Sequence, residues 1–520
     1  MPRSFRTLLA LLVAAMLVAT TFAQTVTFAE DEEPDTLDPH KTSTALAGRI
    51  LRYAGDTLLT KDLSGAYADG LAASWEASDD GLTWTFTLKE GILFQDGTPV
   101  DAAAVRASIE RAVDPETQSP IAGSLFEPVQ DIEVIDDLTL ALTLDEPFSP
   151  FLDNLTDPRG SIVNVAAAEA AGADFGRAPV LTGPWRVTGW ASGDRITLER
   201  NPDYAWGPSY TSGGAPTIEQ LVFRPIPESA TQVAAFEAGE VQVIQTFPPI
   251  DVERFQDDER FVLESFLRKG VGLFMELNTT AEPFTDETVR TAMNHAIDPS
   301  ILVQVVLRGL GQEAHGVLPP SIWGYWDGMP EYDQAFDPER ALALFAEAGW
   351  TREGDGPLMK DGEPFTFTLF TAPIDTWTRS AQIVQGMLAE LGIEMEIQTY
   401  EFGTLLERYR AAEHQAGFMG YTYTNPDIVH LWFHSSNIGS GLAHSHFPSD
   451  ELDALIERSR TETDPDTRLE IYAEIQRFIS DRALWVPLWT NDNYIAVSAA
   501  IDGALVHPDG FLLMNDATLE

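Results

Sequence analysis

Histidines show the spacing best suited to chemistry in this chain. Four of its nine histidines lie between positions 430 and 446, namely His430, His434, His444 and His446. On a helix, His430 and His434 would share one face because they are four residues apart, and neutral imidazole is a good ligand for nickel, zinc or copper. The same residues could instead lie on a polar surface, or one of them could hydrogen-bond an organic ligand. Because the spacing does not decide between these three alternatives, we assign no metal-binding residues, and we predict no cofactor.

Aromatic residues close to charged ones form a second pattern. Two segments, each following an apparent strand, combine the two types: Trp377 with Arg379, and Tyr421 and Tyr423 with Asp427. Loops that follow strands build the ligand clefts of α/β proteins. Aromatic rings bury ligand surface at low entropic cost, whereas Asp and Arg select charge. We therefore predict that these residues contact a ligand; the alternative is that the rings pack in the core.

The sequence contains no compact catalytic motif. It has no GxSxG, GxxxxGK, GxGxxG or HExxH pattern and no EF-hand spacing. A carboxylate pair for glycoside hydrolysis cannot be singled out among 81 acidic residues. We therefore predict no catalytic residues and a protein that is not an enzyme. A secreted hydrolase is the alternative from a different class.

Composition excludes several kinds of partner and site. The 520 residues include 81 acidic and 32 basic side chains, which gives a net charge of -49. Nucleic acids and anionic lipids require Lys and Arg to neutralise their phosphates, so neither is an expected partner. The absence of cysteine excludes disulfides, thiolate metal sites and a lipid-modified N-terminal cysteine.

Residues 1–23 have the pattern of a secretory signal peptide. Two arginines precede an apolar run over 8–19, and Ala23 offers a small residue before a cleavage site at Gln24. The run is shorter than the roughly 20 residues that a membrane span needs. We predict a soluble monomer that is exported to the periplasm or another extracytoplasmic space and is not lipid-anchored. The alternative is an uncleaved anchor.

Alternating strands and helices must position these side chains. Positions 83–88 (TWTFTL) alternate apolar and polar residues, which indicates a half-buried strand. A helix is expected over 101–113 with Asp101 as its N-cap, and further helices over 380–391 and 449–460. This mixture predicts an α/β or α+β protein built in several layers.

Five groups of segments carry a family pattern. They are, in order, 33–40 (EPDTLDPH), 71–100 with LAASW, GLTWTF and FQDGTPV, 181–185 (LTGPW), 277–298 with LN, PF, VRTAM and AID, and 388–393 (LAELGI) with 449–453 (SDELD). Each segment alone could occur in unrelated proteins, but the occurrence of all five groups in this order is specific. Together they resemble the extracellular solute-binding proteins of family 5, the peptide- and nickel-type receptors of ABC importers.

The resemblance implies two α/β lobes, with an extra domain inserted into the first. Lobe I would comprise 24–46, 180–266 and 489–520, the extra domain 47–179, and lobe II 267–488. A ligand between the lobes would stabilise the closed state through contacts to both. The closed protein would then deliver the ligand to the permease of an ABC importer.

The resemblance also implies a peptide or peptide-like solute as the ligand, with a nickel chelate or an oligosaccharide as alternatives. Glu33 matches by its spacing an acidic residue that approaches peptides in oligopeptide receptors. The 420–427 loop lacks the acid before Pro426 that holds the peptide amine in such receptors, so an amine clamp is not expected there. The predicted ligand-binding residues are Glu33, Trp377, Arg379, Tyr421, Tyr423, Asp427 and His446.

Overall fold

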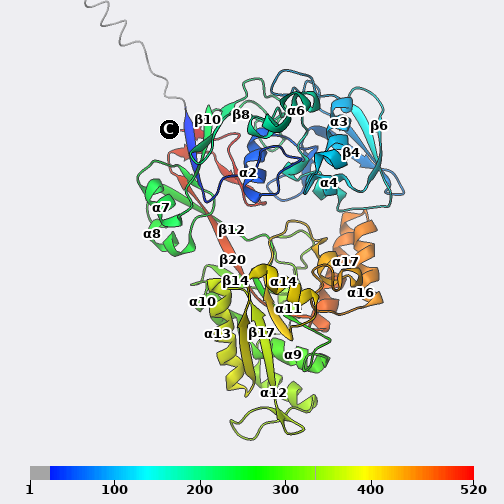
Figure 1. Ribbon diagram of the computed structural model, residues 1–520, viewed down its shortest axis with the longest axis vertical. Helices are drawn as coiled ribbons and strands as arrows, with labels where there is room; N and C mark the ends of the chain where they lie inside the picture. Colours follow the sequence, from blue (N-terminus) through cyan, green and yellow to red (C-terminus); the bar gives the residue numbers. More distant parts are fainter. Residues whose placement is uncertain (1–23, 334) are drawn as a thin grey trace, which may run out of the picture.

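The computed structural model describes residues 24–333 and 335–520, so the predicted signal peptide over 1–23 lies outside the described residues. The molecule is elongated, and an upper and a lower part are joined by strands β12 (Phe261–Leu267) and β20 (Trp485–Ser498) (Figure 1). Lobe I and the extra domain form the upper part, and lobe II the lower part. Among the described residues, no helix has both the length and the apolar character needed to cross a membrane.

One mixed sheet, of 12 strands in the described part of the chain, passes through both lobes. In lobe I it contains β1 (Thr25–Glu30), β8 (Trp185–Ala191), β9 (Arg195–Arg200), β10 (Gln220–Pro225), β11 (Val243–Ile244) and β12. In lobe II it contains β13 (Leu273–Leu277), β14 (Gly311–Glu313), β17 (Thr366–Thr371), β18 (Glu394–Thr399) and β19 (Ala416–Met419). The order is β18-β17-β19-β13-β20-β11-β1-β10-β9-β8, with β12 and β14 also paired to β20.

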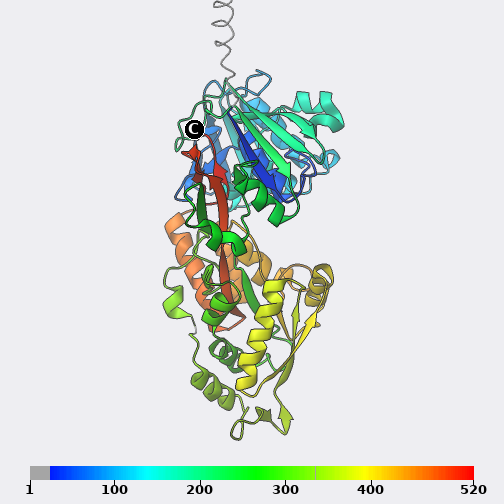
Figure 2. The ribbon, with the colours of Figure 1, turned by 90° about the vertical axis from the view of Figure 1, so that its left-hand side faces the viewer.

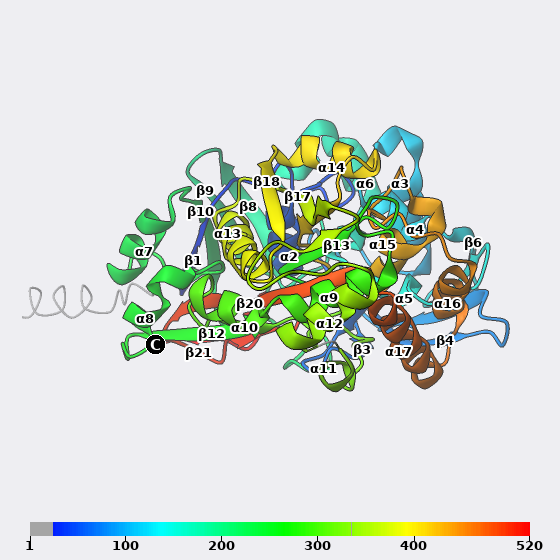
Figure 3. The same ribbon diagram turned by 90° about the horizontal axis from the view of Figure 1, so that it is seen from below.

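Strand β20 belongs to both lobes. It pairs antiparallel with β13 over residues 485–489 and with β12 over residues 492–498. Figure 2 shows it running from one lobe into the other, and Figure 3 shows β12 beside it. Its apolar ends are buried, whereas residues 491–493 (NDN) are only half-buried. The polar stretch therefore marks the place where the strand crosses between the lobes.

The core of lobe I lies between the sheet and helix α2 (Ala45–Ala54). Strands β1 and β10 are parallel neighbours, and the rings of Phe28 and Phe223 stack with their centroids 4.7 Å apart. Thr44 caps α2 because its side chain accepts a hydrogen bond from the first turn of the helix. The buried apolar side chains of α2 lie in the core of lobe I, although the predicted boundary after residue 46 divides the helix.

The remaining elements of lobe I are short. They are the helices α7 (Ser229–Glu237) and α8 (Val252–Phe255), and two strand pairs near the C-terminus, β21 (Ile501–Asp502) with β24 (Thr518–Leu519) and β22 (Leu505–Val506) with β23 (Leu512–Leu513). Helices α7 and α8 pack against the lobe I end of β12 in a cluster of phenylalanine rings, in which Phe236 and Phe261 have centroids 4.5 Å apart.

The extra domain is built on an antiparallel sheet in the order β4-β5-β7-β6. Its elements are β2 (Leu59–Lys61), β3 (Tyr67–Asp69), β4 (Ala72–Ala77), β5 (Thr83–Leu88), α3 (Ala102–Val113), α4 (Ala122–Phe126), β6 (Val129–Val134), β7 (Thr139–Leu144), α5 (Phe151–Asn154) and α6 (Val165–Ala171). The predicted strand over 83–88 is confirmed as β5, and the predicted helix as α3, with Asp101 accepting a hydrogen bond from the Ala104 N–H.

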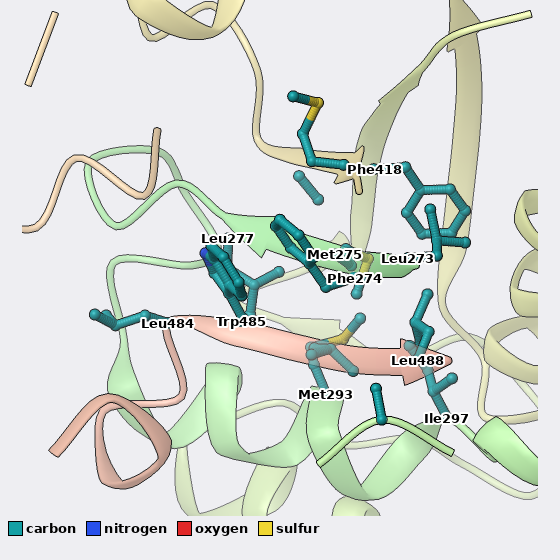
Figure 4. Close-up of a cluster of buried hydrophobic side chains, with 14 of the residues drawn as sticks. Leu273, Phe274, Met275, Leu277, Met293, Ile297, Phe418, Leu484, Trp485 and Leu488 are labelled. Carbon is teal, nitrogen blue, oxygen red and sulfur yellow. The ribbon is translucent and has the colours of Figure 1, made fainter. Parts of the chain in front are cut away.

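Strand β13 forms the centre of lobe II. All five of its residues are buried, and the ring of Phe274 stacks on that of Trp485 with centroids 3.6 Å apart (Figure 4). Met293 and Ile297 approach the same pair of strands from the helical side (Figure 4). This contact joins β13 to β20 through side chains as well as through backbone hydrogen bonds.

Helices cover the lobe II sheet. They are α9 (Glu287–Ala296), α10 (Pro299–Val305), α11 (Met329–Tyr332), α12 (Pro338–Glu347), α13 (Asp375–Glu390), α14 (Phe402–Arg410), α15 (Ile428–Phe433), α16 (Asp450–Thr461) and α17 (Pro465–Asp481), with the small hairpin of β15 (Met359–Lys360) and β16 (Glu363–Pro364). The predicted helix over 449–460 is confirmed as α16, capped by Ser449. Helix α13 begins five residues before its predicted start at 380, because its first turn buries Trp377 in the lobe II core.

The buried clusters follow the predicted division of the chain closely but not at every residue. One cluster lies within 271–489, one joins β1 to the C-terminal segment, and one lies mainly within 58–162. Packing identifies cores and does not show which parts move as units. The division into lobes and an extra domain at the stated residues therefore stays a prediction.

Gly270 lies in the segment between β12 and β13, where the chain crosses between the lobes. It has a φ of +106°, and a Cβ there would lie 2.2 Å from the backbone oxygen of Tyr421. A side chain at this position would thus meet both an unfavourable backbone conformation and a direct clash.

We expect Gly270→Ala to lower the free energy of unfolding by about 2 kcal/mol or more, because both penalties apply. Gly193→Ala is the matched control, since Gly193 also has a positive φ (+72°) but a Cβ there would meet nothing within 4 Å. The control should cost only about 1 kcal/mol. Denaturation in urea measures both variants, and equal losses would show that the contact with Tyr421 is not a constraint.

Candidate functional site

A cavity of about 650 Å³ lies between the extra domain and lobe II. Its lining combines aromatic and charged side chains from the two sides: Lys61, Tyr67, Trp75, Trp84 and Asp153 from the extra domain, and Trp323, Thr463, Pro465 and Arg468 from lobe II. The volume falls within the range of roughly 300–1,000 Å³ found for small-molecule sites. Such sites combine apolar walls with a few polar groups that orient the ligand, as this cavity does.

Neighbouring strands of the extra domain present the aromatic wall. Trp75 lies on β4 and Trp84 on the adjacent β5, while Tyr67 begins β3. Trp84 is buried, and its indole N–H has no hydrogen-bond partner among the described residues. A buried donor without a partner is costly, so a ligand acceptor in the cavity would stabilise this side of the site.

Arg468 on α17 supplies positive charge from lobe II. It is only 4% exposed, its Nε donates to the Ser459 carbonyl oxygen at 2.8 Å, and its guanidinium lies 4.9 Å from the centre of the Trp323 ring. Within the described part of the chain, no ion pair with a carboxylate is found for this arginine. Asp153 and Asp427 lie near enough to act on its charge without pairing with it directly. A buried guanidinium that lines a cavity and has no direct ion pair can still bind an anionic ligand group.

Lys61 and Asp153, in contrast, already satisfy each other. Lys61 Nζ lies 2.7 Å from Asp153 Oδ1, and each side chain is 9% exposed. Burial lowers the pKa of Lys61, but the charge of Asp153 outweighs burial and raises it overall. The pair is continuous with Asp509, whose pKa is lowered because nearby cations, Arg52 first among them, outweigh the effect of burial. The contact that joins this wall of the cavity to lobe I is the 2.8 Å approach of His507 Nε2 to the Lys61 carbonyl oxygen.

The edge of the cavity is a direct contact between the extra domain and lobe II. The Ser149 N–H donates to the Arg460 carbonyl oxygen at 2.7 Å, and the Ser149 hydroxyl donates to the Glu462 carbonyl oxygen. The Arg460 guanidinium lies 5.0 Å from the centre of the Phe148 ring. Figure 1 shows α16 and α17 directly below the extra domain. The two parts thus touch on the side opposite the crossing strands.

Asp427 lies beside this contact. Its Oδ1 is 3.1 Å from Arg460 Nε, an ion pair in which the N–H is not aligned for a hydrogen bond. Burial raises the pKa of Asp427 to about 6, although Arg460 and Arg468 act in the opposite direction. The carboxyl can therefore change its protonation state in mildly acidic solution.

The three predicted ligand-binding Trp and Tyr side chains pack within lobe II. Trp377 and Tyr423 are 6% and 9% exposed and belong to the lobe II core, where the Tyr423 hydroxyl donates to the Val317 carbonyl oxygen at 3.0 Å. Tyr421 packs on Trp432 with ring centroids 5.2 Å apart, and its buried hydroxyl has no partner among the described residues. These positions favour a packing role for Trp377 and Tyr423.

The other predicted residues are held by local partners. Glu33 accepts hydrogen bonds from Trp190, Ser192 and Gly193, which outweigh burial and lower its pKa. Arg379 lies on the surface 3.8 Å from Asp375, and His446 Nε2 is 2.7 Å from the Tyr409 carbonyl oxygen. The structure thus disperses the predicted residues over both lobes, and none of the seven lines the cavity. Their contact with a ligand stays a prediction.

Sequence reasoning missed the residues that do line the cavity. Trp84 belongs to the TWTFTL pattern that predicts β5. The alternation of apolar and polar residues in this strand is the signal that places its side chain on the buried face. Trp323 and Arg468 carry no local signal, because they reach the cavity only through the packing of lobe II against the extra domain.

Two lobes that share one sheet, with a ligand-sized cavity between the extra domain and lobe II, are typical of a solute-binding protein. The family model described as "Bacterial extracellular solute-binding proteins, family 5 Middle" matches residues 66–440. The chain belongs to this family, and the predicted resemblance and two-lobed mixed α/β fold are confirmed.

Relatives and solved structures cover nearly the whole chain. A glutathione-binding protein GsiB from Shigella dysenteriae serotype 1 is 28% identical over 528 residues, which cover 98% of this chain and 97% of the relative. HbpA2 from Haemophilus parasuis has the same fold, with a TM-score of 0.83, 24% identity and coverage of 95% and 100% of the two chains. DppA from Helicobacter pylori, solved with the peptide STSA, gives a TM-score of 0.70, 26% identity and coverage of 95% and 98%. The names of GsiB and DppA describe binding proteins.

We expect the stability of the protein to depend on pH through Asp427. Its pKa is about 6 when folded, above the value of roughly 3.9 for an unfolded chain. The folded state therefore binds the proton more tightly, and the stability that this provides is lost as the pH rises from about 4 to about 6. Asn at this position cannot ionise.

Urea unfolding of the wild type and of Asp427→Asn at about pH 4, 5, 6 and 7 tests this expectation. The variant should gain stability relative to the wild type as the pH rises. A difference that stays constant over this range would contradict a raised pKa.

Proposed function

We propose that this protein is the extracytoplasmic receptor of an ABC importer and that it binds a peptide-like solute with a free carboxylate in the cavity between the extra domain and lobe II. The single observation that carries the proposal is Arg468, a guanidinium that is 4% exposed and faces the cavity without a carboxylate partner among the described residues. The relatives support the class of ligand, since one is named for glutathione and another was solved with a tetrapeptide.

The cavity has groups for each part of such a solute. Arg468 would pair with a carboxylate, and its planar fork suits bidentate contact. Trp75 and Trp323 would cover the apolar surface of the ligand, and the Trp84 N–H would donate to a peptide oxygen. Glu76 and Asp79 at the cavity wall would attract an amine, so no clamp in the 420–427 loop is required.

Binding would couple the two parts of the molecule. A solute held by both walls stabilises the arrangement in which they are close, because only that state makes all of its contacts. We propose that closure bends the chain near Glu264–Gly270 and Leu488–Asn491, at the predicted boundary of lobe II. The closed monomer would then dock on the permease and release the solute without chemical change, as a binding protein and not an enzyme.

Calorimetric titration of the protein tests the proposed ligand class. The panel comprises glutathione, short peptides, the same peptides with an amidated C-terminus, a nickel–histidine complex and an oligosaccharide. Peptides with a free carboxylate should bind, and amidation should weaken them about 30-fold. Binding of only the nickel complex or only the oligosaccharide would overturn the proposal. Small-angle scattering should give a smaller radius of gyration with bound ligand.

We expect Arg468→Gln to weaken the best ligand of that panel by about 30-fold, the effect of losing one charge-assisted contact of about 2 kcal/mol. Arg477→Gln is the matched control, because Arg477 lies on the same helix and does not line the cavity. Equal affinities of the two variants would contradict a role of Arg468 in binding.

A second comparison decides between the cavity and the residues predicted from sequence. Trp75→Ala should weaken binding and leave the melting temperature nearly unchanged, because the ring is half-buried at the cavity wall. Trp377→Ala should lower the melting temperature, because its ring is 6% exposed in the lobe II core. If Trp377→Ala instead weakens binding and melts normally, the sequence prediction is correct.

A further inference from the structure

The histidine pair singled out by its spacing is brought together in space. His430 lies in α15 and His434 is the residue at which that helix ends. Their imidazole rings stack with centroids 4.7 Å apart and planes inclined by 29°. Two imidazoles on one side of a helix end can present their nitrogens to one point, which is the first requirement for shared coordination of an ion.

Glu457 on α16 adds a carboxylate to this pair. Its Oε1 lies 3.1 Å from His434 Nε2, and one ligand atom from each of the three residues lies within 4.8 Å of the others. Around a tetrahedral zinc ion with bonds of roughly 2.0–2.1 Å, neighbouring ligand atoms are about 3.3 Å apart. Small rotations of the side chains would therefore suffice to reach that geometry.

The junction of α15 and α16 is fixed by other contacts. The Ser435 N–H donates to Asp453 Oδ1 at 2.9 Å, and the Ser449 N–H donates to the Ser435 hydroxyl at 3.2 Å. His434 Nδ1 faces the Ser436 hydroxyl at 2.8 Å, which orients its ring and leaves Nε2 toward Glu457. The three side chains are thus held together by a framework that does not depend on Glu457.

The ring nitrogens of His430 are available to an ion. No hydrogen bond to either of them is found among the described residues, and one of them lies within 4.8 Å of ligand atoms of His434 and Glu457. Neutral imidazole is the form that binds metal.

We propose that His430, His434 and Glu457 form a binding site for one divalent transition-metal ion, with zinc(II) as the ion that fits best. Two imidazoles and one carboxylate match the ligand preference of zinc and disfavour calcium and magnesium, which take oxygen ligands. None of the three residues lines the cavity between the extra domain and lobe II. The site is therefore independent of the proposed solute and of the way in which that solute is bound.

A bound ion would join two helices next to the contact between lobe II and the extra domain. Asp427 directly precedes α15, and Arg460 lies one turn after Glu457 on α16. These two residues pair with each other, and the Arg460 carbonyl oxygen accepts the Ser149 N–H of the extra domain. Zinc would hold α15 and α16 together and would stabilise the folded chain by mass action.

Zinc titration of the full chain, after treatment with a chelator, tests the site. The wild type should bind one zinc ion per chain by native mass spectrometry and should show a higher melting temperature with zinc but not with magnesium or calcium. His430→Ala and Glu457→Gln should each weaken zinc binding at least about 100-fold, because each removes a ligand. Glu457 is about half exposed, so its replacement by Gln leaves the fold intact for the measurement.

Two matched variants control for binding elsewhere. Glu451→Gln removes an exposed acid from the same helix, and His295→Ala removes a half-buried histidine from α9. Both should bind zinc like the wild type. The proposal is overturned if the wild type binds no zinc in the presence of a competing chelator of about micromolar affinity, or if His430→Ala and Glu457→Gln bind it as well as the controls do.

Discussion

The backbone hydrogen bonds of β20 are the constraint on which the arrangement of the molecule depends. The strand pairs with β13 in lobe II and with β12 in lobe I, so each half is fixed within a different lobe. The half-buried residues 491–493 lie where the two ladders meet, and they are themselves paired, Asn491 with Gly311 of β14 and the next two residues with β12. In the proposed closure, the width of the cavity on the opposite side would be set by the angle between the lobes and by the contact of Ser149 with Arg460.

Charge is distributed differently on the whole molecule and in the cavity. The chain carries a net charge of -49, which repels an anionic solute at long range. That repulsion is screened beyond roughly 8 Å at physiological ionic strength. Within the cavity, Lys61 is neutralised by Asp153, whereas Arg468 retains its charge without a carboxylate partner among the described residues. Recognition of a carboxylate would therefore be a short-range effect that requires entry into the cavity.

The four histidines between 430 and 446 divide into two pairs according to burial. His444 is 1% exposed and lies 3.1 Å from Glu276, and His446 contacts a backbone oxygen in the same core. These two stabilise lobe II. His430 and His434 lie instead at the junction of α15 with α16, where a carboxylate from the second helix approaches them. The same residue type is thus used for packing in one pair and is available for coordination in the other.

The sequence by itself determined the fold class, the strand β5, the helices α3 and α16, and the family, because alternation, capping residues and segment order are local properties. It could not determine the candidate site. Trp377 follows a strand, as cleft residues do, and only packing shows that it is buried. Trp84 and Arg468 line one cavity, and His430 lies near Glu457, only because distant segments pack together. No local pattern in the sequence encodes such neighbours, so only the tertiary structure decides them.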